Sequence, residues 1–316
     1  MQRVVSKHQQ RGAVAILFAL LMVALTASVA AAISYDVALD VRRTNAMLLQ
    51  EQARLVALGA EDWSGDLLRQ DAVDTEDDHL GELWAQELPP LPIEGAGPDG
   101  IISGQIIDLQ SRFNLNNMID GEGQPVELEV ERFKRMLTNN GLNPELSDAV
   151  LDWMDGDQDF TFPSGAEDDV YTSRLPPMRA ANQAFRSVNE LAAVEGFDKA
   201  AMDLLQPHLT ALPSQTPINI NTATPVVVQS LDESMTPAVI NELREVRLEN
   251  GFDDLSVQLA GSLPADTIAT LQTQSEYFQL RSVVRIGTVR FTMYSLLYRS
   301  AQGEIAVVMR SFGSSL

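Results

Sequence analysis

An uncharged stretch near the amino terminus constrains this chain more than any other feature. Residues 13–35 read AVAILFALLMVALTASVAAAISY and contain no acidic or basic side chain. A helix rises about 1.5 Å per residue, so the stretch would extend about 35 Å and could cross a hydrocarbon core of about 30 Å. The preceding segment carries Arg3, Lys7 and Arg11 and no acid. Basic residues before a span place its amino end in the cytoplasm and the rest of the chain outside.

Two interpretations of this amino terminus compete. The small residues 27–32 (ASVAAA) fit a secretory signal peptide that signal peptidase removes. Residues 33–58, however, contain neither Pro nor Gly, and their apolar residues lie near helical spacing. One continuous helix over residues 13–58 would be about 70 Å long, and a disposable signal has no need of such an extension. We therefore predict a transmembrane and amphipathic helix over residues 13–60 that stays attached to the mature protein.

The remaining sequence is strand-like, then helical, then strand-like again. Residues 89–100 (PPLPIEGAGPDG) predict an irregular connection, and residues 101–109 alternate as a strand does. Helical patterns follow at residues 130–137, 144–153, 188–194, 226–231, 237–248 and 265–271, and strand patterns at residues 277–284, 288–299 and 304–310. We predict an α+β fold in which residues 61–120 and 275–316 form one domain, interrupted by a large all-α insertion over residues 121–274.

An acidic segment, residues 152–169 (DWMDGDQDFTFPSGAEDD), is the candidate site for a metal ion. Its carboxylates recur at alternate positions and supply the oxygen ligands that a hard cation such as Ca²⁺ requires. The segment is not an EF-hand, because Phe160 stands at the position of the turn glycine and Ala166 at that of the bidentate glutamate. A solvated acidic loop would have the same composition. The predicted ligands are Asp155, Asp157, Asp159, Glu167 and Asp168.

Composition and motifs argue against catalysis and against nucleic-acid binding. The formal net charge is −22, whereas contact with a nucleic-acid backbone needs clustered Lys and Arg. The chain has no cysteine, which removes disulfides, thiolate zinc sites and cysteine nucleophiles. The histidines His8, His79 and His208 form no HExxH motif, and there is no GxSxG or GxxxxGK[ST] motif. We predict no catalytic residue and a non-enzymatic role.

The sequence RG/AVAILFALLMVAL resembles the processing site of type IV pilin-like proteins, with cleavage between Gly12 and Ala13. Most of that family have Glu at the fifth mature position, where this chain has Leu17. A carboxylate there can offset the charged amino terminus of a neighbouring subunit, and either charge alone is costly in apolar surroundings. A subunit without it is poorly suited to lie beneath another copy in a repeating shaft.

Further segments resemble, in the same order, the large minor pseudopilin of the bacterial type II secretion system, subunit K. They are LVALGAEDW (55–63), WAQELPPLPIE (84–94), SGQIIDLQSRFNLNN (103–117), LDWMD (151–155), GAED (165–168), PMRAAN (177–182) and TPININTA (216–223). Ordered motifs over most of the chain are far more specific than the leader alone, which would indicate only a pilin-like protein.

This resemblance implies a pilin-like fold, with a long N-terminal helix plus an antiparallel sheet. It also implies that a prepilin peptidase removes the leader, residues 1–12, that the new amino group is methylated, and that the helix anchors a periplasmic domain in the inner membrane. The family places subunit K at the pseudopilus tip, beside minor subunits I and J and above the shaft, where it supports export of folded proteins. Subunit K proteins are similar in binding Ca²⁺ in their helical region.

Two alternative functions follow from other parts of the sequence. Residues 218–252 look like a helix-hairpin-helix unit, which would suit a membrane-anchored DNA-uptake protein. Against DNA contact, Arg247 is followed by Glu249, Asp253 and Asp254, and we interpret the unit as a packing and interaction module. The other alternative is a soluble periplasmic enzyme that signal peptidase releases, with its mature chain starting near residue 33.

Overall fold

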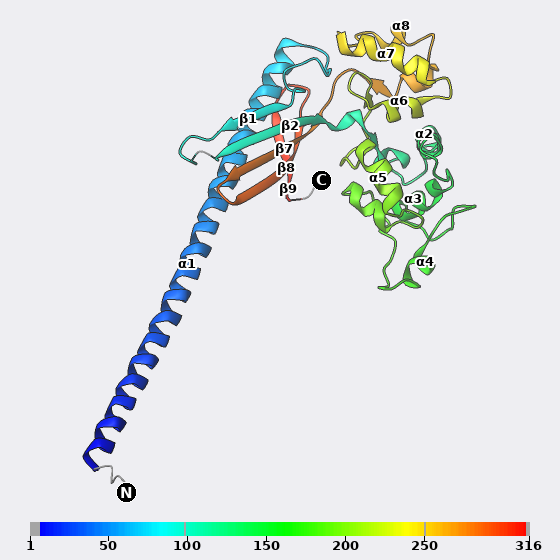
Figure 1. Ribbon diagram of the computed structural model, residues 1–316. Coiled ribbons are helices and arrows are strands. Elements are labelled where there is room, and N and C mark those ends of the chain that lie inside the picture. The colour runs from blue at the N-terminus through cyan, green and yellow to red at the C-terminus, as the bar shows by residue number, and fades with distance from the viewer. Residues whose placement is uncertain (1–6, 98, 250, 314–316) are drawn as a thin grey trace.

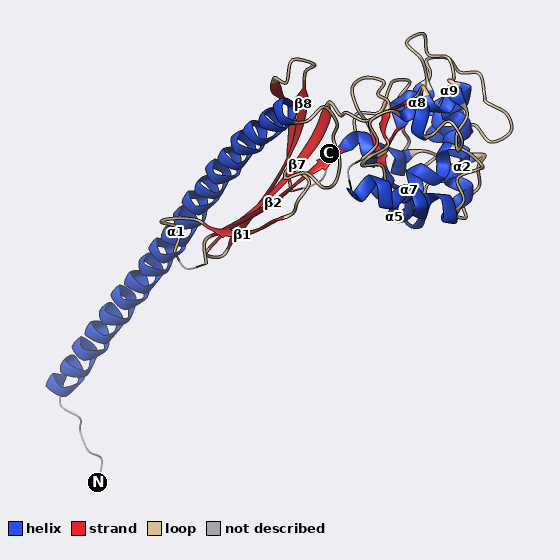
Figure 2. Ribbon diagram, turned by 90° about the horizontal axis from the view of Figure 1, so that it is seen from above, coloured by secondary structure: helices blue, strands red, loops and turns tan. Residues whose placement is uncertain are grey.

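The computed structural model describes residues 7–97, 99–249 and 251–313. One helix, α1 (Lys7–Asp74), runs from the amino-terminal end to the folded part of the chain (Figure 1). Its amino-terminal half lies clear of the rest of the protein, and its carboxy-terminal half packs along one face of a sheet (Figure 2). Residues 1–6 of the predicted leader lie outside the described residues.

Helix α1 continues well beyond residue 60, where the predicted helix ends. Ala53, Ala57, Ser64 and Leu68 recur at helical spacing and are all buried, with the three apolar ones packed against the sheet. No proline interrupts this stretch. The apolar face therefore carries the helix on to Asp74, through residues that the prediction assigned to the domain after the helix, and the predicted helix end at residue 60 was too early.

The sheet has five strands in the order β1-β2-β7-β8-β9, and each neighbouring pair is antiparallel. The strands are β1 (Leu88–Pro92), β2 (Ile101–Asp108), β7 (Tyr277–Ile286), β8 (Val289–Arg299) and β9 (Ile305–Phe312). Alternate residues of β7, including Phe278, Leu280 and Val284, are buried in the clusters that contain α1 side chains. Strands from before and after the insertion thus share one sheet, as predicted.

The insertion between β2 and β7 is a second body with a large core of its own. Its helices are α2 (Glu127–Asn139), α3 (Leu146–Met154), α4 (Asp168–Thr172), α5 (Lys199–Leu205), α6 (Pro225–Leu231), α7 (Pro237–Glu249), α8 (Leu255–Gln258) and α9 (Ala265–Ile268). Short 3-10 helices lie at Leu109–Ser111, Leu115–Met118, Val188–Ala193 and Gln206–His208. The sequence patterns located most of these helices, whereas α4, α5 and α8 were not predicted.

The insertion is not all-α as predicted. Strand β3 (Phe113–Asn114) pairs in parallel with β4 (Leu209–Thr210). Strand β5 (Ile218–Asn219) pairs in the same way with β6 (Leu271–Gln272). Each of these strands has two residues, too few for the alternation of side chains to be visible in the sequence.

The insertion also begins before the predicted residue 121. Phe113, Leu115 and Met118 are fully buried in its core, and the ring of Phe113 stacks on that of Phe133 with 5.6 Å between centroids. The chain leaves the sheet after β2, so the apolar residues that follow belong to the second body.

Asp108, the last residue of β2, joins the two bodies. Its buried carboxylate accepts hydrogen bonds from Asn219 Nδ2 at 3.1 Å, Ser275 Oγ at 2.7 Å and the backbone N–H of Gln110 at 2.8 Å, and from the hydroxyl of Thr222. Burial raises the pKa of Asp108 to about 6, against the opposing effect of the hydroxyl donors. Both crossings between the sheet and the insertion therefore meet at one carboxylate.

A second cluster of carboxylates surrounds Arg299 and fastens the end of α1 to β8. Oxygens of Asp71, Asp78 and Glu82 lie within 4.8 Å of one another. The guanidinium of Arg299 donates to Asp71 at 3.3 Å and also to Asp78, while Glu82 accepts from the indole N–H of Trp84 at 2.7 Å. Because these carboxylates have donors and a cation of their own, this cluster is a structural network.

Asp71→Asn is expected to stabilise the protein more at pH 8 than at pH 5. Burial, followed by the charges of Glu82 and Asp78, raises the pKa of Asp71 to about 7. An acid whose pKa is higher in the folded state loses stability as the pH rises from its unfolded value, about 4, toward 7. The amide removes this loss and still accepts from Arg299, so the gain at pH 8 should exceed that at pH 5 by about 2 kcal/mol.

Thermal unfolding of the detergent-solubilised chain at both pH values measures this difference as a few degrees in Tm. The matched control is Asp74→Asn, an exposed residue of the same helix whose carboxylate bonds Gln70. Equal shifts of Asp71→Asn at the two pH values would contradict the expectation.

Candidate functional site

The acidic segment lies in the insertion, between the end of α3 and the start of α4. Helix α3 is buried from Ser147 to its last residue, Met154, so the loop that follows it starts from a rigid support. Carboxylate oxygens of Asp155, Asp157 and Glu167 lie within 4.8 Å of one another. The two ends of the loop are thereby brought to one point, although Glu167 lies twelve positions after Asp155 in the sequence.

Several oxygens of this cluster are buried without a hydrogen-bond donor. Both carboxylate oxygens of Glu167 and Oδ1 of Asp155 have no partner among the described residues, and Glu167 is 4% exposed. Burial, followed by the charge of Asp152, raises the pKa of Glu167 to about 7. Burial, followed by Asp157, raises the pKa of Asp155 to about 6. Unpaired acceptors in such a place are costly unless a proton or a cation neutralises them.

The donor set fits Ca²⁺. Two oxygens on one calcium ion, each at about 2.3–2.6 Å from it, can be up to about 5 Å apart, and the observed spacing lies within that limit. Asp155, Asp157 and Glu167 would hold the ion, which would supply the positive charge that the cluster lacks. The ion would then join carboxylates that lie at the two ends of the loop and far apart in the sequence.

The structure gathers three of the five predicted ligands and leaves two outside. Asp159 is exposed, and its backbone N–H donates to Asp157 Oδ1 at 2.8 Å. Asp168 accepts from the backbone N–H of Ala180 at 3.0 Å and lies 3.7 Å from the guanidinium of Arg179. Its carboxylate caps another part of the chain instead of joining the cluster.

Asp152 supports the loop and was not among the predicted ligands. It is fully buried at the end of α3, and its carboxylate accepts from the backbone N–H of Thr161 at 3.2 Å. Gly165 packs against the same group: a Cβ there would collide with the Asp152 carboxylate and lie 2.6 Å from the Thr161 carbonyl oxygen. The glycine is thus needed for the close approach that brings Glu167 back to the cluster. The sign of this role in the sequence was that Asp152 lies on the last turn of a helix, three residues before Asp155.

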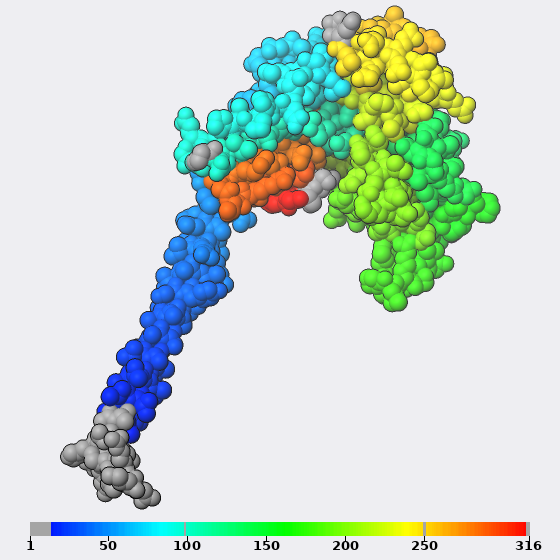
Figure 3. All heavy atoms as spheres, viewed as in Figure 1, coloured from blue at the N-terminus to red at the C-terminus, as the bar shows by residue number. Residues whose placement is uncertain are grey.

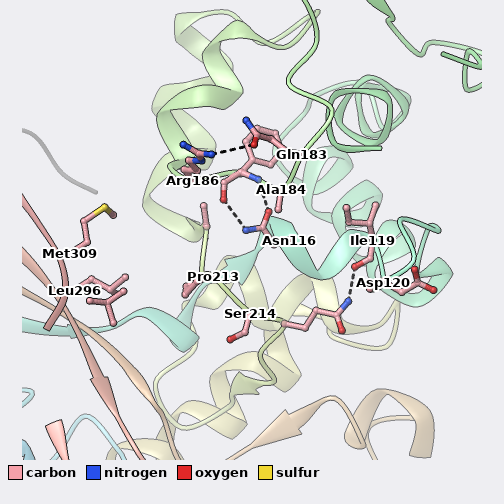
Figure 4. A pocket seen from close by; sticks show the side chains of 15 residues that line it. Asn116, Ile119, Asp120, Gln183, Ala184, Arg186, Pro213, Ser214, Leu296 and Met309 are labelled. Atoms are coloured by element: carbon pink, nitrogen blue, oxygen red, sulfur yellow. Dashed lines mark hydrogen bonds between the residues drawn. The ribbon is translucent and has the colours of Figure 1, made fainter. Parts of the chain in front are cut away.

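A cleft of about 720 Å³ lies where the sheet meets the insertion. Figure 4 shows Leu296 and Met309 of the sheet on one side and Asn116, with the segment around Arg186, on the other. Asn116 fixes that segment because its Nδ2 donates to the carbonyl of Phe185 at 2.9 Å and its Oδ1 accepts from the N–H of Phe185 at 2.8 Å. Among the described residues that line the cleft, the ionisable side chains are those of Asp120 and Arg186.

The amino-terminal half of α1 is a further candidate interaction surface. Among the described residues α1 is the one helix long and apolar enough to cross a membrane. Large apolar side chains such as Leu17, Phe18 and Leu21 are each more than 60% exposed. So large an exposed apolar surface requires lipid or other helices around it. Gly12 and Ala13 lie within α1, and their side chains are outside the described part of the chain.

Comparisons with known proteins agree with this architecture. Residues 111–214 match the family described as type II secretion system (T2SS), protein K. Type II secretion system protein K of Pectobacterium carotovorum subsp. carotovorum is 35% identical, over 97% of this chain and 98% of that protein. This chain belongs to the type II secretion system protein K family. The protein K of Pseudomonas aeruginosa PAO1 is 32% identical, over 95% of this chain and 92% of that protein.

A solved structure is similar to this protein K over most of its length. It is the GspK-GspI-GspJ complex from the enterotoxigenic Escherichia coli type 2 secretion system, with a TM-score of 0.75 and 25% identity. The match covers 86% of this chain and 100% of that chain. The predicted pilin-like α+β fold and the predicted role as a minor pseudopilin of type II secretion are confirmed. The alternative of a DNA-uptake protein finds no support in these similarities.

Proposed function

We propose that this protein K is a non-enzymatic subunit at the tip of the pseudopilus. In this proposal α1 anchors it in the inner membrane, the folded domains stand in the periplasm, and growth of the pseudopilus beneath it drives folded proteins through the outer membrane.

The position of the insertion is the observation that carries this proposal. The chain crosses into and out of the insertion at Asp108 and Ser275, and Ser275 donates its backbone N–H to Asp78, just after the end of α1. The insertion therefore joins the sheet at the end farthest from the amino terminus (Figure 1). The insertion lies beside the sheet and broadens the part of the protein that is far from the amino terminus (Figure 3), which suits a subunit with no further copy above it. Leu17 agrees with such a place, because a terminal subunit has no subunit above it whose amino group needs a carboxylate.

Minor subunits I and J are the proposed neighbours. The similar solved structure is a complex of GspK with GspI and GspJ, and the match covers the whole of the matched chain in it. The exposed apolar half of α1 offers the surface for packing against other amino-terminal helices, and its small residues allow close approach.

Ca²⁺ is the proposed ligand of the insertion. The support is the set of buried carboxylate oxygens of Asp155 and Glu167 without donors, together with the convergence of Asp157 on them. In this proposal the ion has a structural role, since it would tie the loop after α3 to the start of α4 and stiffen the insertion.

The intact mass of the protein, expressed with and without its prepilin peptidase, tests the pilin-like processing. The expected product is a chain beginning at Ala13, formed only when the peptidase is present. The matched variant Gly12→Leu should keep its leader under both conditions. A chain that begins near Ile33 whether or not the peptidase is present would contradict the proposal and favour a protein released by signal peptidase.

A further inference from the structure

Charge is unevenly distributed between the sheet and the rest of the chain. The whole sequence has twice as many acidic as basic side chains, 44 against 22. Strands β7, β8 and β9 contain five arginines and neither Asp, Glu nor Lys. The three strands therefore form a basic surface on a strongly acidic protein.

Two of the five arginines are neutralised by the helix and the turn that follows it. Arg299 pairs with Asp71 and Asp78, and Arg310 of β9 forms a two-pronged ion pair with Glu61 of α1. Glu61 is 3% exposed, so the charge of Arg310 is well matched on this side of the sheet.

The other three arginines belong to the opposite face. Arg281 and Arg285 alternate along β7 with the residues that pack against α1, and Arg290 lies directly opposite Arg285 on β8. All three side chains are exposed, and in the described part of the chain none of them has an ion pair or side-chain hydrogen bond. We call Arg281, Arg285 and Arg290 the arginine face. The hairpin that carries it lies at the surface (orange in Figure 3).

The cross-strand pair of Arg285 and Arg290 is unfavourable in the isolated chain. Like charges directly opposite each other on an antiparallel pair are destabilising, whereas an anion between them would reverse the sign. Tyr294 stands opposite Arg281, and Thr292 opposite Val283, so the arginines frame a strip that contains an aromatic and two β-branched side chains. Arginine and tyrosine around an apolar centre are the composition of a protein interface.

We infer that the arginine face is a docking surface for a carboxylate-bearing face of a neighbouring pseudopilin. The charge of the face is complementary to an acidic surface, and the two-pronged guanidinium groups suit carboxylates. The choice of a pseudopilin as the partner rests on the function proposed above.

Lipid phosphates are the less suitable partner because of distance. The turn of the β7–β8 hairpin lies beside α1 at Leu49, where a Cβ on Gly287 would be 3.7 Å from Leu49 Cδ1. The uncharged stretch of the helix ends at Tyr35, and a helix rises about 1.5 Å per residue, so the turn stands about 20 Å beyond it. The Debye length at physiological salt is about 8 Å, and attraction to headgroups at that distance is largely screened.

The test compares binding of full-length variants, in a neutral detergent, to subunits I and J of the same secretion system. The variant R281E/R285E/R290E reverses the face, and the matched control R186E/K199E/R244E reverses three exposed basic residues of the insertion. Both variants change the net charge equally, and the reversed face keeps a like-charged pair across the strands.

The expected result is binding at least tenfold weaker for the face variant and a change below twofold for the control. A lysine variant, R281K/R285K/R290K, should retain most of the binding, and wild-type affinity should fall more steeply with salt than that of the face variant.

Other outcomes decide against the inference in distinct ways. Equal binding by wild type and the face variant refutes the docking surface and leaves the proposed function intact. If the wild-type chain binds neither subunit, the proposed function fails, and the inference fails with it. The charge reversal could also have no effect in detergent or in phosphatidylcholine nanodiscs and an effect only in phosphatidylglycerol nanodiscs. That result would assign the arginine face to lipid and overturn the inference.

Discussion

Addition of Ca²⁺ to the chelated protein is expected to raise its Tm by about 10 °C. A ligand that binds only the folded state, at a thousand times its Kd, stabilises that state by about 4 kcal/mol. In a domain of this size, 1 kcal/mol corresponds to about 2–4 °C. The large effect follows from the site, since Glu167 and Asp155 have buried oxygens that no donor satisfies, and the ion would both neutralise and coordinate them.

Two variants separate ligation from general charge effects. Asp155→Asn/Glu167→Gln should lose the response to Ca²⁺ and should be more stable than wild type in chelator, because the repulsion between the carboxylates is gone. The matched control is Asp159→Asn, which removes an exposed carboxylate of the same loop outside the cluster. It should respond to Ca²⁺ as wild type does, and Mg²⁺ at the same concentration should have a smaller effect. A wild-type Tm that does not change with Ca²⁺, measured in detergent by differential scanning fluorimetry, would contradict the site.

The parts of the fold that were predictable depend on local periodicity. Strands β7, β8 and β9 are eight or more residues long and rich in β-branched and aromatic residues, and α1 begins with a long uninterrupted apolar stretch, so both were visible in the sequence. The end of α1 was misplaced because the acidic residues on its exposed face hid the spacing of Ser64 and Leu68. The two-residue strands of the insertion carry no periodicity and exist because the packing of its core brings distant segments together.

The type of residue in the candidate site was predictable from the sequence, whereas the individual residues that form it were not. Alternate acids after α3 indicated a cation, yet Asp159 points to solvent while Glu167 returns to the cluster from the far side of the loop. That return depends on Gly165 lying against the buried Asp152, a long-range contact that spacing alone does not contain. The arginine face was missed for a related reason. Arg285 and Arg290 become a like-charged pair only when the register of two strands is known.

Asp108→Ala is expected to destabilise the protein by about 3–5 kcal/mol and to uncouple its two bodies. The buried carboxylate accepts from three side chains on two other segments, Asn219 and Thr222 on one and Ser275 on the other, and its removal takes away the acceptor of these donors inside the protein. Each such group costs about 1–3 kcal/mol. The matched control Asp120→Ala truncates an exposed aspartate whose carboxylate accepts, among the described residues, only from the nearby backbone N–H groups of Glu122 and Gln124, and it should change stability by less than about 1 kcal/mol.

Separate unfolding of the sheet and the insertion would show that Asp108 joins the two bodies, which an ordinary buried residue would not do. The sheet and the insertion have separate cores, and the described hydrogen bonds from Asp108 span the place where the chain crosses between them twice. In wild type, unfolding in urea followed by far-UV circular dichroism and by tryptophan fluorescence should give one transition, because the bodies unfold together. Asp108→Ala should split it, since Trp84 lies in the sheet core and Trp153 in the insertion core. Asp108→Asn, which keeps an acceptor, should lie between the two. A single coincident transition in Asp108→Ala would show that apolar contacts, and not this carboxylate, join the insertion to the sheet.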